Sequence, residues 1–247
     1  MNIVSRVTNK LPNIQILSKN TKFKLYSQAD LQVQKHLKKP PHYLDFCKEF
    51  TDGGDSELLQ QNMINSMTVH NDFLSENEEQ SILDEIEPYM KRLHYEFDHW
   101  DDAIHGYRET ERLKWNEQNT KIIDRVRRKA FPPNVAQLKF VHILDLEKNG
   151  YIKPHIDAVR FCGDTIAGLS LLSDSVMRLV HDKNKTLFAD ILLKRRSLYI
   201  MKDSARFDYK HEILNNENSI FKGERVLKER RISVICRNQP DPGKKNS

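Results

Sequence analysis

Cysteine is scarce in this chain of 247 residues, which contains only three: Cys47, Cys162 and Cys236. Three cysteines do not form a disulfide framework for a chain of this size, which excludes the small secreted proteins that are held together by disulfides. Cys162 and Cys236 have apolar sequence neighbours, so we expect both to be buried free thiols. A reducing compartment is therefore expected.

Long apolar runs are also missing. Hydrophobic residues make up 38% of the chain, and no stretch approaches the roughly 18–20 apolar residues that cross a bilayer. We therefore expect a soluble globular protein without membrane insertion, and a monomer. A chain of this length can bury one substantial core, with room for an extra segment at one end. The formal net charge of +5 permits contact with RNA but does not argue for it.

Acidic residues are absent from residues 1–29, although this stretch carries five basic residues together with several Ser and Thr. Such a composition is typical of a mitochondrial transit peptide, which we predict over residues 1–30. The alternative is an ordinary disordered basic terminus. Residues 31–68 have weak periodicity and several turn residues, so we interpret them as a linker or a poorly ordered segment.

An ordered domain is predicted over residues 69–238. Ser75 and Glu78 have the spacing of a capping box before a helix, although Pro88 inside the helical pattern predicts a kink or a break. A second helix is predicted over residues 115–130. From Leu138 the apolar period shifts toward two, which predicts seven or eight strands at 138–146, 151–157, 165–173, 176–181, 187–192, 197–201, 207–214 and 231–237.

This order of elements favours an α+β fold that is mostly β, with a double-stranded β-helix (jelly roll) as its core and the helices at its N-terminal side. Residues 239–247 are rich in lysine, and we expect them to form a flexible tail.

The most informative motif is His155-Ile156-Asp157. In an extended segment, two residues separated by one position project to the same side. A second histidine would complete the 2-His-1-carboxylate triad that binds non-haem Fe(II) and leaves coordination positions open, and His211 is the best candidate. Either histidine alone would more often be a surface residue or a satisfied core group. His142 matches no such pattern, and we interpret it as a packing or surface residue.

Arg231 follows on a predicted strand, where a guanidinium can pair with a carboxylate through two hydrogen bonds. Alone it would more often be a solvated charge, but the four residues at these spacings are far more specific. Such a site suits 2-oxoglutarate, whose distal carboxylate would meet Arg231. Reaction with O2 would convert 2-oxoglutarate to succinate and oxidise a nearby C–H bond, while the protein supplies orientation and a dry cavity.

At this point the chain resembles the AlkB family of Fe(II)/2-oxoglutarate dioxygenases. The matching pieces are His155-x-Asp157, Ser204-x-Arg206 followed by His211-x-Ile213, and Arg231-x-Ser233-x-Ile235-x-Arg237. The runs at 95–111, 150–155 and 161–173 narrow the resemblance to a mitochondrial member, and it covers about residues 69–238.

The resemblance implies iron at His155, Asp157 and His211, which would be the catalytic centre. It also implies 2-oxoglutarate held by Arg231 and Ser233, with help from Tyr199 and Arg237. The Tyr199 hydroxyl, on a predicted strand, can reach a carboxylate.

The departures from the family pattern concern the co-substrate and the lid. Leu144 and Leu146 stand where many members carry Asn and Tyr that hold 2-oxoglutarate, and Ser233 and Ile235 replace the family's Asn and Thr. Residues 131–139 are too short for the nucleotide-recognition lid of the repair enzymes. The resemblance therefore implies an open active site that admits a protein side chain more readily than it clamps a flipped base.

Three hypotheses follow. The first is a dioxygenase of the mitochondrial matrix that hydroxylates a protein and is not a DNA repair enzyme; the resemblance adds roles in alkylation-induced programmed necrosis and in mitochondrial fatty-acid and energy metabolism. The second is an oxidative demethylase of mitochondrial RNA, with Trp100 and Tyr107 as exposed aromatic side chains that stack on bases. The third is a scaffold that keeps the metal site but acts by binding partners.

Overall fold

A computed structural model describes residues 38–50, 56–97 and 103–240 of the chain. All of its helices and strands belong to one unit, Pro40–Ser247, which is separate from residues 1–39. The predicted transit peptide at 1–30 lies outside the described residues, as does nearly all of the predicted tail at 239–247.

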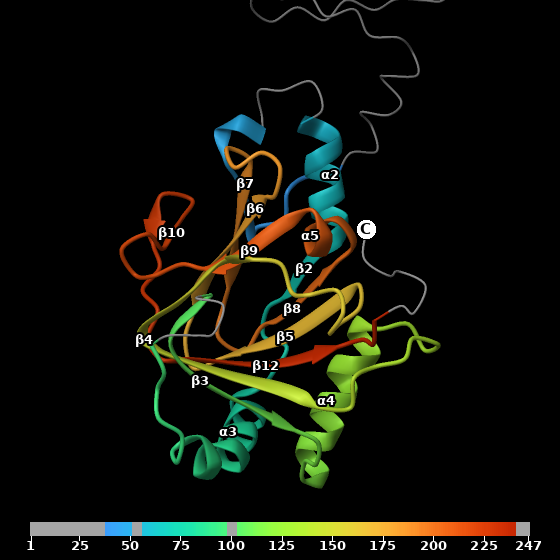
Figure 1. Ribbon diagram of the computed structural model, residues 1–247, viewed down its shortest axis with the longest axis vertical. Coiled ribbons are helices and arrows are strands. Elements are labelled where there is room, and N and C mark those ends of the chain that lie inside the picture. The colour runs from blue at the N-terminus through green and yellow to red at the C-terminus, as the bar shows by residue number, and fades with distance from the viewer. Residues whose placement is uncertain (1–37, 51–55, 98–102, 241–247) are drawn as a thin grey trace, which may run out of the picture. The chain divides into compact units, whose positions relative to one another are not determined.

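The helices and strands alternate along the chain as follows (Figure 1). The helices are α2 (Ser56–Ser66), α3 (Glu76–Met90), α4 (Glu117–Ala130) and α5 (Asp203–Phe207), together with a short 3-10 helix, η1 (Lys48–Phe50). The strands are β1 (Leu44–Phe46), β2 (Met67–His70), β3 (Ile104–Arg112), β4 (Val141–His155), β5 (Thr165–Leu171), β6 (Ser175–His181), β7 (Phe188–Leu193), β8 (Leu198–Lys202), β9 (Tyr209–Ile213), β10 (Ile220–Phe221), β11 (Glu224–Arg225) and β12 (Arg231–Arg237).

Strand β4 joins the two halves of the antiparallel sheet. The strand order is β1-β7-β6-β9-β4-β12-β5-β8-β2, with β3 on the other side of β4. The first half of β4 pairs with β12, whereas its end pairs with β9, where His155 lies opposite His211. Because one strand serves both halves, the sheet curls into the jelly roll that the sequence predicts, and the mostly-β fold class is confirmed.

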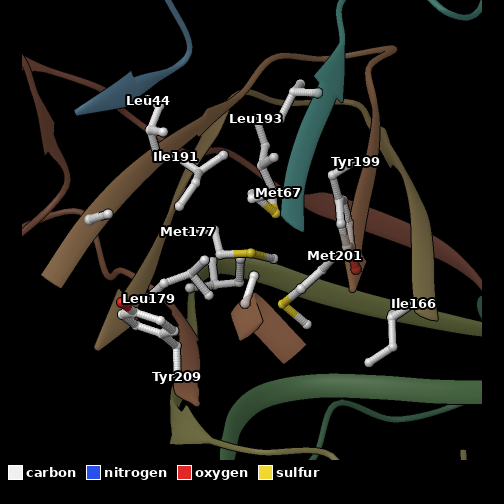
Figure 2. Close-up of a cluster of buried hydrophobic side chains, with 14 of the residues drawn as sticks. Leu44, Met67, Ile166, Met177, Leu179, Ile191, Leu193, Tyr199, Met201 and Tyr209 are labelled. Atoms are coloured by element: carbon white, nitrogen blue, oxygen red, sulfur yellow. The ribbon is translucent and has the colours of Figure 1, made fainter. Parts of the chain in front are cut away.

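The core between the two halves is formed by alternate residues of the strands. Figure 2 shows Met177 and Ile191 from one half pointing toward Tyr199, Met201 and Ile166 from the other. A strand places successive side chains on opposite faces, so the neighbouring residues of β5, β8 and β12 point outward. They pack against the apolar faces of α3 and α4 in a second buried cluster. These two helices cover the outer face of this half (Figure 1).

Helix α3 begins at the predicted capping box: the Ser75 hydroxyl accepts from the backbone N–H of Glu78, and the Glu78 carboxylate accepts from the backbone N–H of Ser75. The break predicted at Pro88 is wrong, because α3 continues through it to Met90. Pro88 lies in the last turn, and the carbonyl that loses its donor belongs to the exposed residue Asp84. Little is therefore lost there.

Residues 31–68 differ from the expected linker in their second half. Leu44, Phe50, Met63 and Met67 are each at most 1% exposed and pack in the core between the sheet halves. Strand β1 pairs with β7, and β2 extends the sheet beyond β8. The apolar residues here are spread over short elements, so local periodicity is weak, and their burial depends on distant strands.

Strand β3 was also not predicted. It pairs with β4 along most of its length, and the register shifts between His105 and Tyr107. Gly106 has a φ of +63° at this bulge, and a Cβ there would lie 2.7 Å from a side-chain oxygen of Glu147. Only glycine fits this left-handed position without strain.

Candidate active site

The three residues predicted to bind a metal lie together at the end of β4 and the start of β9. The ligand atoms of His155, Asp157 and His211 all lie within 4.8 Å of one another. Asp157 Oδ1 is 3.4 Å from His155 Nε2 and 3.7 Å from His211 Nε2. The strand predicted to reach Asp157 ends at His155, so the carboxylate comes from the following loop. Cross-strand pairing brings the two histidines together, with ring centroids 4.2 Å apart.

The protonation states of this cluster suit a divalent cation. His155 Nδ1 lies 2.9 Å from the carbonyl oxygen of Lys153; because a carbonyl only accepts, Nδ1 carries the proton and Nε2 keeps its lone pair. Burial, followed by the charge of His155, lowers the pKa of His211 to about 3, so this imidazole is neutral. Burial alone would raise the pKa of Asp157, but the hydrogen bond with His155 and the charge of Arg237 hold it well below its ordinary value.

Two arginines hold Asp157 from outside the cluster. Arg237 Nε donates to Asp157 Oδ2 at 3.0 Å. Arg206, on α5, donates through Nη2 to the backbone carbonyl of Asp157 at 2.6 Å and to Cys162 Sγ at 3.2 Å. The side-chain oxygen Oδ1 therefore remains on the side of the two histidines.

Arg231 is a buried cation, 1% exposed, on the concave face of β12. Its Nε donates to Ser170 Oγ at 3.1 Å and its Nη1 donates to Ser233 Oγ at 2.6 Å. Its Nη2 is buried and has no hydrogen-bond partner among the described residues. Burial lowers the pKa of Arg231 to about 10, so it remains charged at neutral pH. A buried guanidinium with a spare donor fits an anionic ligand.

Tyr199 lies beside this arginine, on β8 and directly opposite Gly168 of β5. A Cβ on Gly168 would lie 2.4–2.6 Å from the phenol ring and its oxygen, so the glycine makes room for the tyrosine. Burial raises the pKa of Tyr199. Its hydroxyl therefore keeps its proton, which it can donate to an anion.

A pocket of about 700 Å³ contains all seven residues predicted for the site (His155, Asp157, Tyr199, His211, Arg231, Ser233 and Arg237). This volume is typical of a small-molecule site. Leu144 also lines the pocket and pairs with Ser233, while Leu146 lies opposite Arg231. The wall that the sequence predicted to be apolar therefore lies directly beside the candidate carboxylate site.

Known proteins share both the sequence and the fold. The chain is 52% identical over 189 residues to a protein of Mus musculus and 50% identical over 188 residues to one of Bos taurus, both named alpha-ketoglutarate-dependent dioxygenase alkB homolog 7, mitochondrial. Each alignment covers 76% of this chain and 85% of the relative. The chain belongs to the AlkB homologue 7 family. The solved structure of OsALKBH1 has a TM-score of 0.52 at 12% identity, covering 70% of this chain and 97% of that one. No family model matches the chain.

As a member of the AlkB homologue 7 family, the protein is a 2-oxoglutarate (α-ketoglutarate) dependent dioxygenase, which uses Fe(II) and takes O2 as co-substrate. The residues present fit both groups. Two neutral imidazoles and one carboxylate form the donor set of non-haem Fe(II), and the spare N–H of Arg231 fits a carboxylate. No helix among the described residues is long and apolar enough to span a membrane.

Sequence reasoning missed several residues of the AlkB homologue 7 site. His142 was interpreted as a packing or surface residue, but it lines the pocket and contacts Arg237. Ser170 holds Arg231 and was not singled out at all. The only local signal for either residue is its position in the alternation of a strand, and that signal becomes useful only when the partner strand is known.

Proposed function

We propose that His155, Asp157 and His211 bind the Fe(II) and that Arg231 binds the distal carboxylate of 2-oxoglutarate. Among the observations, the buried Nη2 of Arg231 without a partner supports this most directly. A donor left without a partner in the interior is costly unless a ligand completes it. In the same pocket lie three side chains whose ligand atoms converge.

The protein's own residues orient the reactants and exclude water. Ser170 and Ser233 hold the guanidinium of Arg231 in place, and Tyr199 offers a protonated hydroxyl beside it. Ile166 and Met177 are buried side chains of the same pocket and keep water out of it. When bound, Fe(II) and 2-oxoglutarate supply the activation of O2 that allows a substrate C–H bond to be oxidised.

Within this activity we propose that the substrate is a protein side chain and not a damaged DNA base. The connection between α4 and β4 is short, from Phe131 to Phe140, and holds no lid. Exposed apolar side chains lie close to the metal candidates in sequence: Phe161, which lines the pocket, is 61% exposed and Val159 is 40% exposed. Exposed apolar residues beside a pocket favour contact with a partner surface.

The test combines a turnover assay with mass spectrometry. Purified enzyme with Fe(II), ascorbate and 2-oxoglutarate is incubated with matrix proteins, and peptides are searched for the mass of one added oxygen atom. His155→Ala serves as the inactive control. A hydroxylated peptide that appears only with the wild-type enzyme supports the proposal, and its absence despite turnover of 2-oxoglutarate contradicts the choice of a protein substrate.

The alternative of RNA demethylation loses part of its basis. Tyr107, expected to be an exposed stacking residue, is 3% exposed and packs in the core; Trp100 lies outside the described residues. Release of formaldehyde from methylated mitochondrial RNA would nevertheless favour it. The scaffold alternative requires that 2-oxoglutarate is not turned over even with iron and reductant.

We further propose the mitochondrial matrix as the location and a role in alkylation-induced programmed necrosis and in fatty-acid and energy metabolism. The names of both relatives include the word mitochondrial, and the acid-free basic start of the chain supports import. Protease protection of the protein in intact mitochondria tests the location. Survival after an alkylating agent and fatty-acid oxidation, compared between cells with wild-type protein and with Asp157→Ala, test the role.

A further inference from the structure

A chain of four polar side chains leads from the edge strand β3 to the metal candidates. Glu109 Oε2 lies 2.8 Å from His142 Nε2, and His142 Nδ1 lies 3.1 Å from Arg237 Nη1. Arg237 Nε then donates to Asp157 Oδ2 at 3.0 Å. The sheet register supports this arrangement, because Glu109 and Glu111 of β3 pair with Leu144 and His142 of β4 and so lie on the same concave face.

The protons of this chain follow from the chemistry of its ends. A guanidinium only donates, so His142 Nδ1 accepts the hydrogen bond from Arg237. The imidazole proton of His142 therefore resides on Nε2 and points to the carboxylate of Glu109. His142 is neutral, and it links a carboxylate at the pocket edge to a guanidinium inside. The side chains of His142 and Asp157 are 16% and 14% exposed, against 37% for Glu109.

We propose that Glu109 and His142 are positioning residues, which hold Arg237 so that Asp157 offers a metal only one of its two oxygens. The inference rests on the metal site proposed above. Arg237 engages Oδ2, while Oδ1 faces both histidines. A carboxylate that binds through one oxygen leaves one more coordination position open, and the iron needs these positions for its co-substrates.

The outer half of the chain is needed because Arg237 has more than one way to meet a carboxylate. A guanidinium can turn to form two parallel hydrogen bonds with a carboxylate, which would engage both oxygens of Asp157. The hydrogen bond to His142 holds Nη1 in the opposite direction. Glu109 in turn fixes the tautomer and the ring orientation of His142, as outer partners do for histidines at metal sites.

The test measures binding of Mn(II), alone, by the EPR signal of the free ion. His142→Leu removes both hydrogen bonds at similar volume, and we expect it to weaken Mn(II) binding about 10-fold, the lower end for the loss of an outer partner. Glu109→Ala should weaken binding in the same direction, and Glu109→Gln, which keeps an acceptor, should largely restore it. Glu111→Ala is the matched control, since Glu111 lies on the same strand and face and also lines the pocket; its Mn(II) affinity should equal that of wild type.

Two further measurements separate positioning from packing. In an Arg237→Ala background, His142→Leu should change Mn(II) affinity less than about twofold, because residues that act through one another are not additive. Water-¹⁷O line broadening of bound Mn(II) should report one water ligand fewer in His142→Leu, as Asp157 takes a second position. A variant that only loosens the fold lowers the melting temperature without changing the number of bound waters.

The outcomes are distinct. If wild type binds no Mn(II), the proposed metal site fails. If wild type binds and both His142→Leu and Glu109→Ala bind equally well with the same number of waters, the positioning role is overturned while the metal site stands. Should His142→Leu fail to fold, the comparison of Glu109→Ala with Glu111→Ala decides, because both residues are exposed.

Discussion

Burying a guanidinium without a carboxylate beside it is costly, and the fold does this at Arg231. No described carboxylate forms an ion pair with it, and its immediate partners are the two neutral hydroxyls of Ser170 and Ser233. The cost makes sense if an anion completes the site during function. At the scale of the residue, the clearest consequence is therefore a dependence of 2-oxoglutarate binding on this one side chain.

Arg231→Ala should raise the 2-oxoglutarate concentration needed for half-maximal turnover by about 30-fold or more, since losing one partner of a buried charged pair costs about 2–5 kcal/mol. Arg231→Lys keeps the charge but loses the fork geometry, so its effect should be smaller. Succinate release measures both. Arg225→Ala, in the exposed β10–β11 hairpin, is the control. An unchanged requirement in Arg231→Ala would assign the carboxylate to other residues.

The thiols provide a second prediction at this scale. Cys236 is 2% exposed and burial raises its pKa to about 11, so about one molecule in 1,000 carries its thiolate at pH 8. Burial also raises the pKa of Cys162, whereas Cys47 is only half-buried. Ellman's reagent should therefore modify one thiol rapidly in the folded protein and three after denaturation. A second rapid thiol would show that one buried site opens readily.

At the scale of the element, β4 and the N-terminal strands determine where the site lies. β4 carries Leu144 in one half of the roll and His155 in the other, so its pairing places the co-substrate wall next to the metal candidates. Strand β2 covers the far edge at β8, the strand of Tyr199. Residues before 69 therefore support the site without contributing a side chain to the pocket.

Truncation tests this role of the N-terminal elements. A chain that begins at Pro40 keeps the core residues Leu44, Phe50, Met63 and Met67 and should melt like the full chain. A chain that begins at Val69 loses all four, and removing one buried large side chain costs about 2–5 kcal/mol, against a total of about 5–15 kcal/mol for a domain. We expect it to lose cooperative thermal unfolding by circular dichroism. Identical melting curves would return residues 40–68 to the status of a linker.

At the scale of the whole molecule, the two sheet halves enclose a charged site inside an apolar core. Each half supplies part of it: β9 contributes His211, while β12 and β8 contribute Arg231 and Tyr199. Ligands that neutralise the buried charges bind only when the halves are packed together. Ligand binding and global stability are therefore linked.

Mn(II) and 2-oxoglutarate together should raise the melting temperature by several degrees, since a ligand at 100 times its Kd stabilises by about 2.7 kcal/mol and a domain of this size shifts by about 2–4 °C per kcal/mol. Glutarate, which lacks the keto oxygen, should give a smaller shift. Differential scanning fluorimetry measures these values. The 2-oxoglutarate part of the shift should disappear in Arg231→Ala; a shift that persists there would place the anion elsewhere.

Asp157→Ala and His211→Ala should abolish binding of Mn(II) while largely preserving the fold, because both side chains line a pocket and neither forms part of the apolar packing. Calorimetry with Mn(II) measures the binding, and far-UV circular dichroism measures the fold. Collapse of the spectrum in either variant would mean that the cluster is structural.

The sequence by itself determined the parts of this protein that have a local physical cause. The Ser75 cap, the alternating strands of the roll and the spacing of His155 and Asp157 follow from backbone geometry and from period two. Arg231 could be selected because a basic residue on a buried strand is chemically unusual. The fold class and the type of chemistry therefore follow from the order of the residues alone.

Only the tertiary structure decided what lies across from these residues. The pairing of His155 with His211 and the chain from Glu109 through His142 to Arg237 all join strands that are distant in sequence. Sheet pairing is non-local, so nothing in the neighbourhood of His142 distinguishes it from a surface histidine. The same reason explains β3 and the buried residues before 69, whose short patterns acquire meaning only when the roll closes around them.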